Sequence, residues 1–247
     1  MNFPLRNGYL AGLAAIVVVG CSAPDDVTAV GPLPTSARSA PSGSVIPAPG
    51  SFASSAAQAA HFAQVEADVL IEINFARTRP GAYADLLQGR RGLFRGLVYH
   101  EPGAVPLRTQ EGTAALDEAV AALRATAPMA PMVASAGLRR AARFHADDLG
   151  PGGLVSHESS DGTPFGPRLA RFGRFRGSTA ENISFGPATG REIVAQLLMD
   201  DGVPSRGHRT NLLQPRLREV GIAVGPHARY RVVCVMDFAD AFDAMTR

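Results

Sequence analysis

Apolar side chains recur every three or four residues along the first part of the chain, which is the period of an amphipathic helix. In the earliest such segment these positions are Val65, Val69, Ile73 and Ala76. Pro80 is expected to interrupt or end this helix, because proline lacks the backbone N–H that a helix interior requires. Residues 82–87 predict a short second helix, and the glycines and prolines of residues 89–106 predict a loop.

Three later segments show the same helical period. Residues 113–125 repeat Ala and Leu at helical spacing, and residues 189–200 carry a stripe of Ile, Val and Leu. Residues 137–149 predict a third helix, which the glycine-rich residues 150–153 should stop. Its apolar face is formed by Leu138, Ala141, Ala142, His145 and Leu149.

Near the C-terminus the period changes to two. Residues 220–224 and 230–239 are rich in β-branched side chains, and residues 225–229 between them have the composition of a hairpin turn. Helices therefore dominate the early part of the chain and strands the late part. This order favours an α+β layered domain over alternating βαβ units.

The first 20 residues do not belong to that domain. They combine one basic residue, Arg6, with an apolar run that is too short to span a bilayer, as in a secretory signal peptide. Residues 18–21 also resemble the bacterial lipobox, in which the signal is cut before the cysteine and that thiol is acylated. Cys21 is then a lipid anchor, and Ser22 after it favours the outer membrane of a two-membrane cell. The alternative is an ordinary signal peptide followed by a chance cysteine.

Residues 21–55 are rich in Ser, Ala, Pro and Gly, a composition that predicts a flexible linker. Residues 56–247 remain for one folded domain, and 46% apolar residues in the chain suffice to build its core. With Cys21 acylated, Cys234 has no partner for a disulfide. Cys234 lies in an apolar alternating run, so we expect a buried and inert thiol.

The charge of the chain argues against a nucleic-acid-binding protein. The formal net charge is +2, and it falls to +1 when Arg6 leaves with the signal peptide. Such a charge generates no strong positive field. Arginine and phenylalanine alternate in residues 168–176, which we interpret as a solvated loop or helix end. We expect a secreted monomer.

Three histidines stand close to acids or glycines: His145, His157 and His208. The chain has no HExxH sequence, no paired-cysteine motif and no glycine-rich nucleotide loop, so spacing alone favours structural histidines. Ser156 precedes His157, but adjacent residues seldom reach triad geometry, and the chain has no GxSxG nucleophile turn. A serine hydrolase is therefore disfavoured.

The order of six short strings resembles the CAP superfamily, the SCP/PR-1-like domain of cysteine-rich secretory proteins, in its bacterial branch. The strings are Ala142–Asp148, Ser156–Gly162, Arg168–Gly173, Ala180–Ile183, Gly207–Leu212 and Val220–Ile222. Each string is weak alone, but their joint order is specific. The resemblance begins near residue 61 and implies an α-β-α sandwich with a mainly antiparallel central sheet. Ala180 replaces the usual glycine, and Leu198 replaces a frequent tryptophan.

The same resemblance implies a cleft with two histidines and two acids. Carried over onto this chain, they are His157, Glu181, Asp201 and His208. Two imidazoles and two carboxylates suit a divalent ion such as Zn²⁺ and leave room for water. Asp201 is one methylene shorter than the glutamate of many relatives, so we expect it to reach the cleft through water. His145 is expected to be structural, and Arg209 and Asn211 to anchor the turn.

CAP-like domains are associated with partner binding, with lipid or sterol binding and, in isolated cases, with proteolysis. The resemblance therefore implies a lipid-anchored, cell-envelope protein that binds a lipid, a protein or another envelope ligand in its cleft. One alternative is a metal-assisted peptidase or esterase with Glu181 as general base. Another is a structural envelope protein in which the polar cleft serves folding alone.

Overall fold

The computed structural model describes residues 55–102 and 106–245. The predicted signal peptide, Cys21 and nearly all of the linker lie outside the described residues. The helices are α1 (Ser55–Thr78), α2 (Pro80–Gly89), α3 (Thr113–Ala125), α4 (Ala136–Gly152), α5 (Phe165–Ala170), α6 (Gly190–Met199) and α7 (Gly207–Leu212), with one 3-10 helix, η1 (Arg90–Leu93). No helix within these residues is long and apolar enough to cross a membrane.

The central sheet has four strands in the order β4-β6-β7-β5. They are β4 (Val133–Ala134), β5 (Gly173–Phe185), β6 (Glu219–His227) and β7 (Arg231–Ala244). β7 runs antiparallel to both β5 and β6, whereas the short β4 runs parallel to β6. The sheet is therefore mainly antiparallel, as predicted, and β5 lies at its edge.

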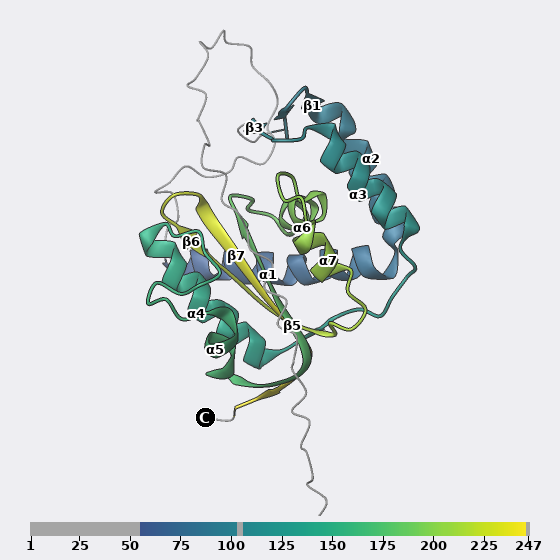
Figure 1. Cartoon of the computed structure of the whole chain (residues 1–247). Helices are drawn as coiled ribbons and strands as arrows, with labels where there is room; N and C mark the ends of the chain where they lie inside the picture. Colours follow the sequence, from purple (N-terminus) through teal and green to yellow (C-terminus); the bar gives the residue numbers. More distant parts are fainter. Residues whose placement is uncertain (1–54, 103–105, 246–247) are drawn as a thin grey trace, which may run out of the picture.

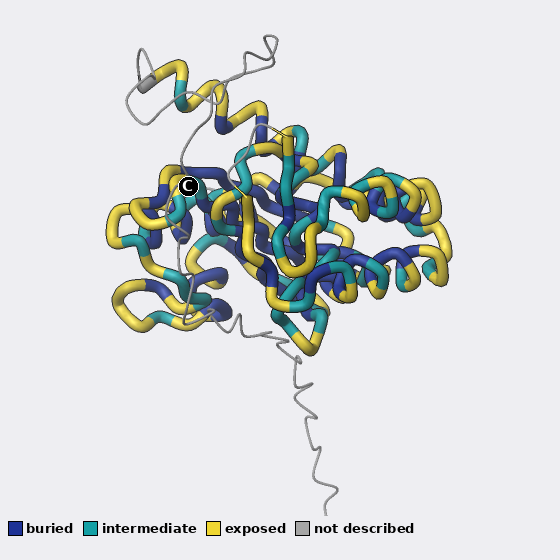
Figure 2. The backbone as a smooth tube through the Cα atoms, turned by 90° about the horizontal axis from the view of Figure 1, so that it is seen from above, coloured by how far each residue is buried: buried dark blue, intermediate teal, exposed yellow. Residues whose placement is uncertain are grey.

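Helices cover both faces of this sheet (Figure 1). Side chains of β6 and β7 alternate, so Ile222 and Met236 pack with α1 and α6, and Ala223 and Val235 pack with α4. The helices α2 and α3 extend the first layer, and α5 extends the second. Figure 2 shows buried segments in the middle of the molecule and exposed ones at its periphery. The predicted α-β-α sandwich is confirmed.

Arg77, at the end of α1, ties that helix to the segment that follows α7. Its guanidinium donates hydrogen bonds to the carbonyls of Ala130, Leu212, Gln214 and Leu217 at 2.9–3.1 Å. The side chain is fully buried, and burial lowers the pKa of Arg77 to about 10. Its four hydrogen bonds to carbonyl oxygens offset the free-energy cost of burying the cation.

The region before α3 and the end of α4 differ from the sequence prediction. The predicted loop of residues 89–106 contains η1 and two strands of a small three-stranded sheet. These strands are β1 (Phe94–Arg95), β2 (Val98–Tyr99) and β3 (Leu107–Arg108). α4 runs to Gly152 rather than stopping at residue 149. Its last turn includes Pro151, and the helix ends where Gly153 forms the left-handed cap.

β5 was not predicted as a strand. Its residues 179–184 are all buried, but the polar Glu181, Asn182 and Ser184 interrupt any alternation of apolar and polar types. Burial on both faces removes the period of two that would reveal a strand. These polar side chains belong to the candidate site.

Candidate functional site

The candidate site lies along β5, where the two helical layers meet at the edge of the sheet. Glu181 faces the α4 layer with its cross-strand partner Asp237, in step with Ile183. Asn182 faces the opposite layer, where its amide donates to the carbonyl oxygen of His208 at 3.1 Å. An edge strand can thus hold one histidine from each side.

The first histidine comes from the loop after α4. His157 Nδ1 lies 2.8 Å from Glu181 Oε1, and the second carboxylate oxygen of Glu181 accepts a hydrogen bond from Arg168. Arg168 also donates to the carbonyl oxygen of His157 at 2.9 Å. The three residues form a closed ring of contacts, which fixes the plane of the imidazole.

Arg168 corrects the prediction that residues 168–176 form a solvated segment. Its side chain is 0% exposed, while Arg171, Arg174 and Arg176 do lie at the surface. The only sequence signal for this role was the place of Arg168 at the start of a family string. Composition alone treats all four arginines alike.

Electrostatics keep His157 neutral. Burial, together with the charges of His208 and Arg168, lowers the pKa of His157 to about 4. His157 Nε2 is buried and has no hydrogen-bond partner among the described residues. If Nδ1 carries the proton and donates it to Glu181, Nε2 presents a lone pair.

Asp237 is a site residue that sequence reasoning missed. It is 0% exposed, and its carboxyl group lies against that of Glu181, a contact that becomes a hydrogen bond only when one of the two acids is protonated. Burial and the negative charge of Glu181 raise the pKa of Asp237 well above its usual value. Burial also raises the pKa of Glu181, which the guanidinium of Arg168 opposes. An acid inside the otherwise apolar run of β7 was the available signal.

The second histidine stands in α7, after the turn that follows α6. His208 Nδ1 lies 2.6 Å from Asp200 Oδ1, and the backbone amide of His208 donates to Asp200 Oδ2 at 2.9 Å. The amide of Arg209 donates to the same oxygen at 3.3 Å. Asp200 and His208 are each only 3% exposed, so this is a second buried imidazole–carboxylate pair.

The structure brings Asp200, rather than Asp201, into contact with His208. The prediction of Asp201 counted along the helix from Leu198, but α6 ends at Met199 and Asp200 takes a left-handed conformation with φ of 56°. The helical phase is lost at that residue. The carboxylate of Asp201 instead accepts the backbone amides of Gln110 and Glu111, each at 2.8 Å.

His157 and His208 are close enough that the charge of one lowers the pKa of the other. In the described part of the chain, no three His, Cys, Asp or Glu side chains are grouped for metal coordination. The metal role of His157, Glu181, Asp201 and His208 stays a prediction.

Three supporting residues behave as predicted. His145 is fully buried, where burial lowers its pKa to about 3, and its Nε2 lies 3.1 Å from the carbonyl oxygen of Ser156. Arg209 donates to the carbonyls of Leu198 and Met199, at 2.6 and 3.0 Å. The amide of Asn211 donates to Asn182 Oδ1 at 2.9 Å. Cys234 is likewise a buried free thiol.

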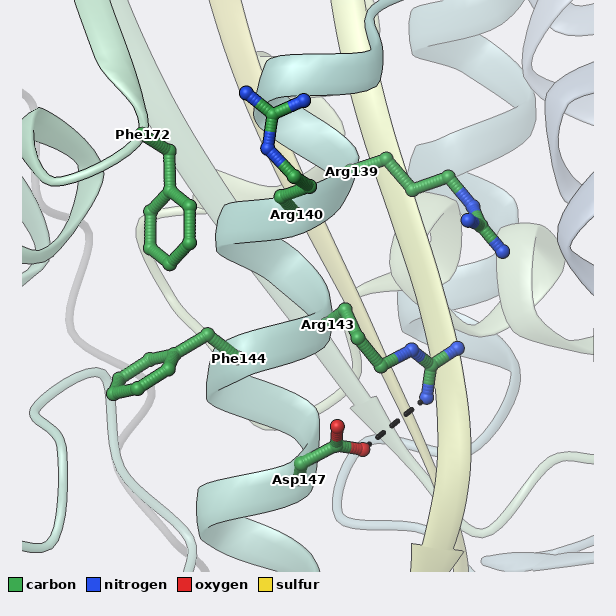
Figure 3. A pocket seen from close by; sticks show the side chains of 6 residues that line it. All are labelled: Arg139, Arg140, Arg143, Phe144, Asp147 and Phe172. Carbon is green, nitrogen blue, oxygen red and sulfur yellow. Dashed lines mark hydrogen bonds and ion pairs between the residues drawn. The ribbon is translucent and has the colours of Figure 1, made fainter. Parts of the chain in front are cut away.

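A second feature of the surface is a hollow on the outer face of α4 (Figure 3). It is lined by Arg139, Arg140, Arg143, Phe144, Asp147 and Phe172. Arg139 and Arg143 both bind Glu66 of α1, and Arg143 also lies 3.4 Å from Asp147. Two of its three arginines are therefore engaged in holding α4 against α1.

Comparisons with known proteins found a matching family and several similar solved structures. Residues 118–238 match CAP, the cysteine-rich secretory protein family. Similar solved structures include an extracellular protein containing a SCP domain from Bacillus anthracis, with 22% identity and a TM-score of 0.38. That alignment covers 49% of this chain and 36% of the Bacillus protein, so it spans little more than a third of that protein. No curated protein matches this chain.

Two other solved structures are similar at lower identity. An outer surface protein from Borrelia burgdorferi has 19% identity and a TM-score of 0.37, over 45% of this chain and 78% of that one. A cysteine-rich secretory protein from Staphylococcus aureus has 14% identity and a TM-score of 0.36, over 58% of this chain and 46% of that one. The match over residues 118–238, joined to the six ordered strings and the α-β-α sandwich, identifies a CAP domain of the cysteine-rich secretory protein family in this chain.

Proposed function

We propose that this chain is a binding module of the cell envelope, which holds its ligand at His157 and His208 with the help of a divalent ion such as Zn²⁺. The observation that carries the proposal is the pairing of each imidazole with a buried carboxylate through Nδ1. Histidines that bind metal ions almost always donate their other ring N–H to such a partner.

The side chains available to coordinate the ion are the two imidazoles, rather than the four predicted ligands. Both oxygens of Glu181 are engaged by His157 and Arg168, and both oxygens of Asp200 are engaged by His208. Asp201 is occupied by backbone amides. Two imidazoles from the two helical layers would then hold the ion, and water or the ligand would complete its coordination. Such an open site binds metal more weakly than a closed four-ligand zinc site.

The geometry favours binding over hydrolysis. A general base needs an oxygen that can reach the proton it removes. Both oxygens of Glu181 are already engaged, one by His157 and one by Arg168, so this carboxylate is poorly placed for the base role that a metal-assisted hydrolase requires. When bound, the ion would supply a Lewis acid that attracts an anionic or polar group of the ligand.

The predicted secretion and lipid anchor supply the cellular context of this proposal. Acylation of Cys21 would hold the module at the cell envelope, at the outer membrane if the cell has two membranes. The ligand is then a lipid, a protein or another component of the envelope. The 33 residues between Cys21 and Ser55, the start of α1, would act as the tether.

Titration of the purified mature chain with Zn²⁺ by calorimetry tests the metal site. We expect one ion per chain, and we expect His157→Ala and His208→Ala each to weaken binding by at least about tenfold. His227→Ala is the matched control, because His227 is equally buried but bonds the carbonyl oxygen of Leu154 at 2.9 Å.

Equal zinc affinity in the wild type and both site variants would refute the site. Zinc-dependent turnover of a peptide or ester panel, lost in His208→Ala, would instead support the hydrolase alternative.

A further inference from the structure

The turn between α6 and α7 has a conformation that its own residues do not favour. Asp200 and Arg206 have φ values of 56° and 49°, in the left-handed region, and Gly202 has a φ of 75°. Left-handed backbone costs free energy for residues other than glycine, and it persists where surrounding contacts determine it. Other parts of the chain must therefore hold this turn in shape.

The contacts that hold it come from residues 110 and 111, about 90 positions earlier in the sequence. Asp201 accepts the backbone amides of Gln110 and Glu111, each at 2.8 Å. In return, the amide of Gly202 donates to Glu111 Oε1 at 2.7 Å. Each segment thus places a carboxylate against the backbone amides of the other, which is a charge-assisted arrangement.

Arg206 closes the arrangement from the other end of the turn. Its guanidinium binds both oxygens of Glu111, at 2.7 and 2.5 Å, and donates to the carbonyl of Asp200 at 2.8 Å. The hydrogen bonds from Arg206 lower the pKa of Glu111 to about 2, so that this carboxylate is ionised at neutral pH. We call Glu111, Asp201, Gly202 and Arg206 the clasp.

The clasp also connects the turn to the small sheet β1-β2-β3. The amide of Thr109 and its hydroxyl both donate to the carbonyl of Leu97 at 2.7 Å. The amide of Gly112 donates to the hydroxyl of Thr109 at 3.2 Å. Residues 109–112 therefore form a continuous link from the small sheet to the turn before His208.

The consequence for the site follows from the adjacency of Asp200 and Asp201. Asp200 orients His208 through both of its oxygens. Asp201 is the next residue of the same turn, and its carboxylate fixes that turn to the backbone of Gln110. We propose that the clasp positions His208. Asp201, from the turn, and Glu111, from the segment of residues 90–112, are then positioning residues for the ligand site. The effect of the clasp on ligand affinity rests on the proposed function, whereas its effect on the orientation of the His208 imidazole does not.

Asp201→Asn in the mature chain tests the clasp, because asparagine keeps the size of the side chain and loses its charge. In metal-free protein, long-range proton–nitrogen NMR correlations report the tautomer and environment of each imidazole. We expect the His208 signals to move and the His157 signals to stay. We expect zinc affinity to fall about tenfold, as for other residues that support a ligand. Asp201→Glu, which keeps the carboxylate, should recover part of both effects.

Asp117→Asn is the matched control. Asp117 holds Arg91 of η1 through two hydrogen bonds, at 2.9 and 3.1 Å, so its loss loosens the same segment without touching residues 200–208. The His208 signals should not move in this variant. If Asp201→Asn does not fold, Glu111→Gln replaces it, because glutamine still accepts from Gly202 but loses the ion pair with Arg206.

Unchanged His208 signals in a folded Asp201→Asn or Glu111→Gln variant would overturn the clasp. Equal movement of these signals in Asp117→Asn would also overturn it. If the wild type binds no zinc, the proposed metal site fails, and the metal-free imidazole signals still decide the clasp.

Discussion

Glu181 and Asp237 face each other across neighbouring strands, yet of the two only Glu181 accepts a hydrogen bond from Arg168. Arg168 and His157 hold the carboxylate of Glu181, whereas Asp237 has no hydrogen-bond donor among the described residues. A buried carboxyl without a donor is more stable in its protonated form. At the residue scale, two acids that look alike in the sequence therefore carry different charges.

Replacing each of these two acids by its amide should change the stability by very different amounts. Asp237→Asn replaces a neutral acid with a neutral amide, so we expect it to change the free energy of unfolding by less than about 1 kcal/mol. Glu181→Gln leaves the buried guanidinium of Arg168 without its counter-charge, and we expect a loss of about 3–5 kcal/mol. Urea unfolding at pH 7 measures both values. A similar large loss in both variants would mean that Asp237 is ionised in the native protein.

The histidines and Glu181 were predictable because each belongs to a short string with a family pattern. The choice between Asp200 and Asp201 was not, since it depends on where α6 ends. One left-handed residue at the end of that helix rotates every later side chain. The site role of Asp237 was not predicted, because its apolar neighbours in β7 have the pattern of an ordinary core strand.

At the scale of elements, the contact between α4 and β6 determines how closely the second layer lies on the sheet. A Cβ atom at Gly221 would lie 2.0 Å from the backbone of both Leu138 and Arg139. Backbone atoms of a packed helix cannot give way as the end of a flexible side chain can. Gly221 is the cross-strand neighbour of Asp237, so this close approach also seals the acid beneath α4.

Gly221→Ala should therefore separate α4 from the sheet. We expect a loss of at least about 3 kcal/mol in the free energy of unfolding, measured in urea, because overpacking strains both elements. Gly81→Ala is the control, since a Cβ there meets nothing within 4 Å and the residue lies in α2. Alanine in that helix should stabilise the protein by about 0.5–1 kcal/mol. A neutral Gly221→Ala would show that α4 shifts freely.

Element prediction succeeded where the apolar period is strong. The helices α1, α2, α3, α4 and α6 and the β6–β7 hairpin lie where the pattern places them, although α1 begins well before Val65 and β7 runs past residue 239 to Ala244. The prediction missed α5, α7, β4 and β5, and the strands β1 to β3. The latter are two residues long and carry no period, and β5 buries polar side chains on both faces.

At the scale of the whole molecule, the chain combines a folded CAP domain with an N-terminal part whose predicted roles are export and attachment. Residues 1–20 carry the signal pattern, and Cys21 follows it directly. Two acyl chains suffice for stable membrane attachment, whereas one gives only marginal binding. A lipobox cysteine that carries a diacylglyceryl group would meet this requirement.

Cys21→Ser should therefore release the protein from the membrane fraction of a bacterial expression host. We expect the wild type to incorporate labelled palmitate and to sediment with membranes, and the variant to do neither. Cys234→Ala is the matched control, because it removes the only other cysteine, which is buried in the core. An unlabelled wild-type protein would favour an ordinary signal peptide with a chance cysteine.

The amino-acid sequence by itself determined the layered α+β class, the main helices, the final hairpin and the family, and it singled out His157 and His208 as candidate site residues. Local apolar periods and short residue strings indicate these features, so residues that are close in the sequence are sufficient to predict them. Only the tertiary structure decided that Asp200 holds His208, that Asp201 binds amides 90 positions away, and that Asp237 lies beside Glu181. Such contacts depend on where separate elements end and meet in space, and no local period along the chain encodes that.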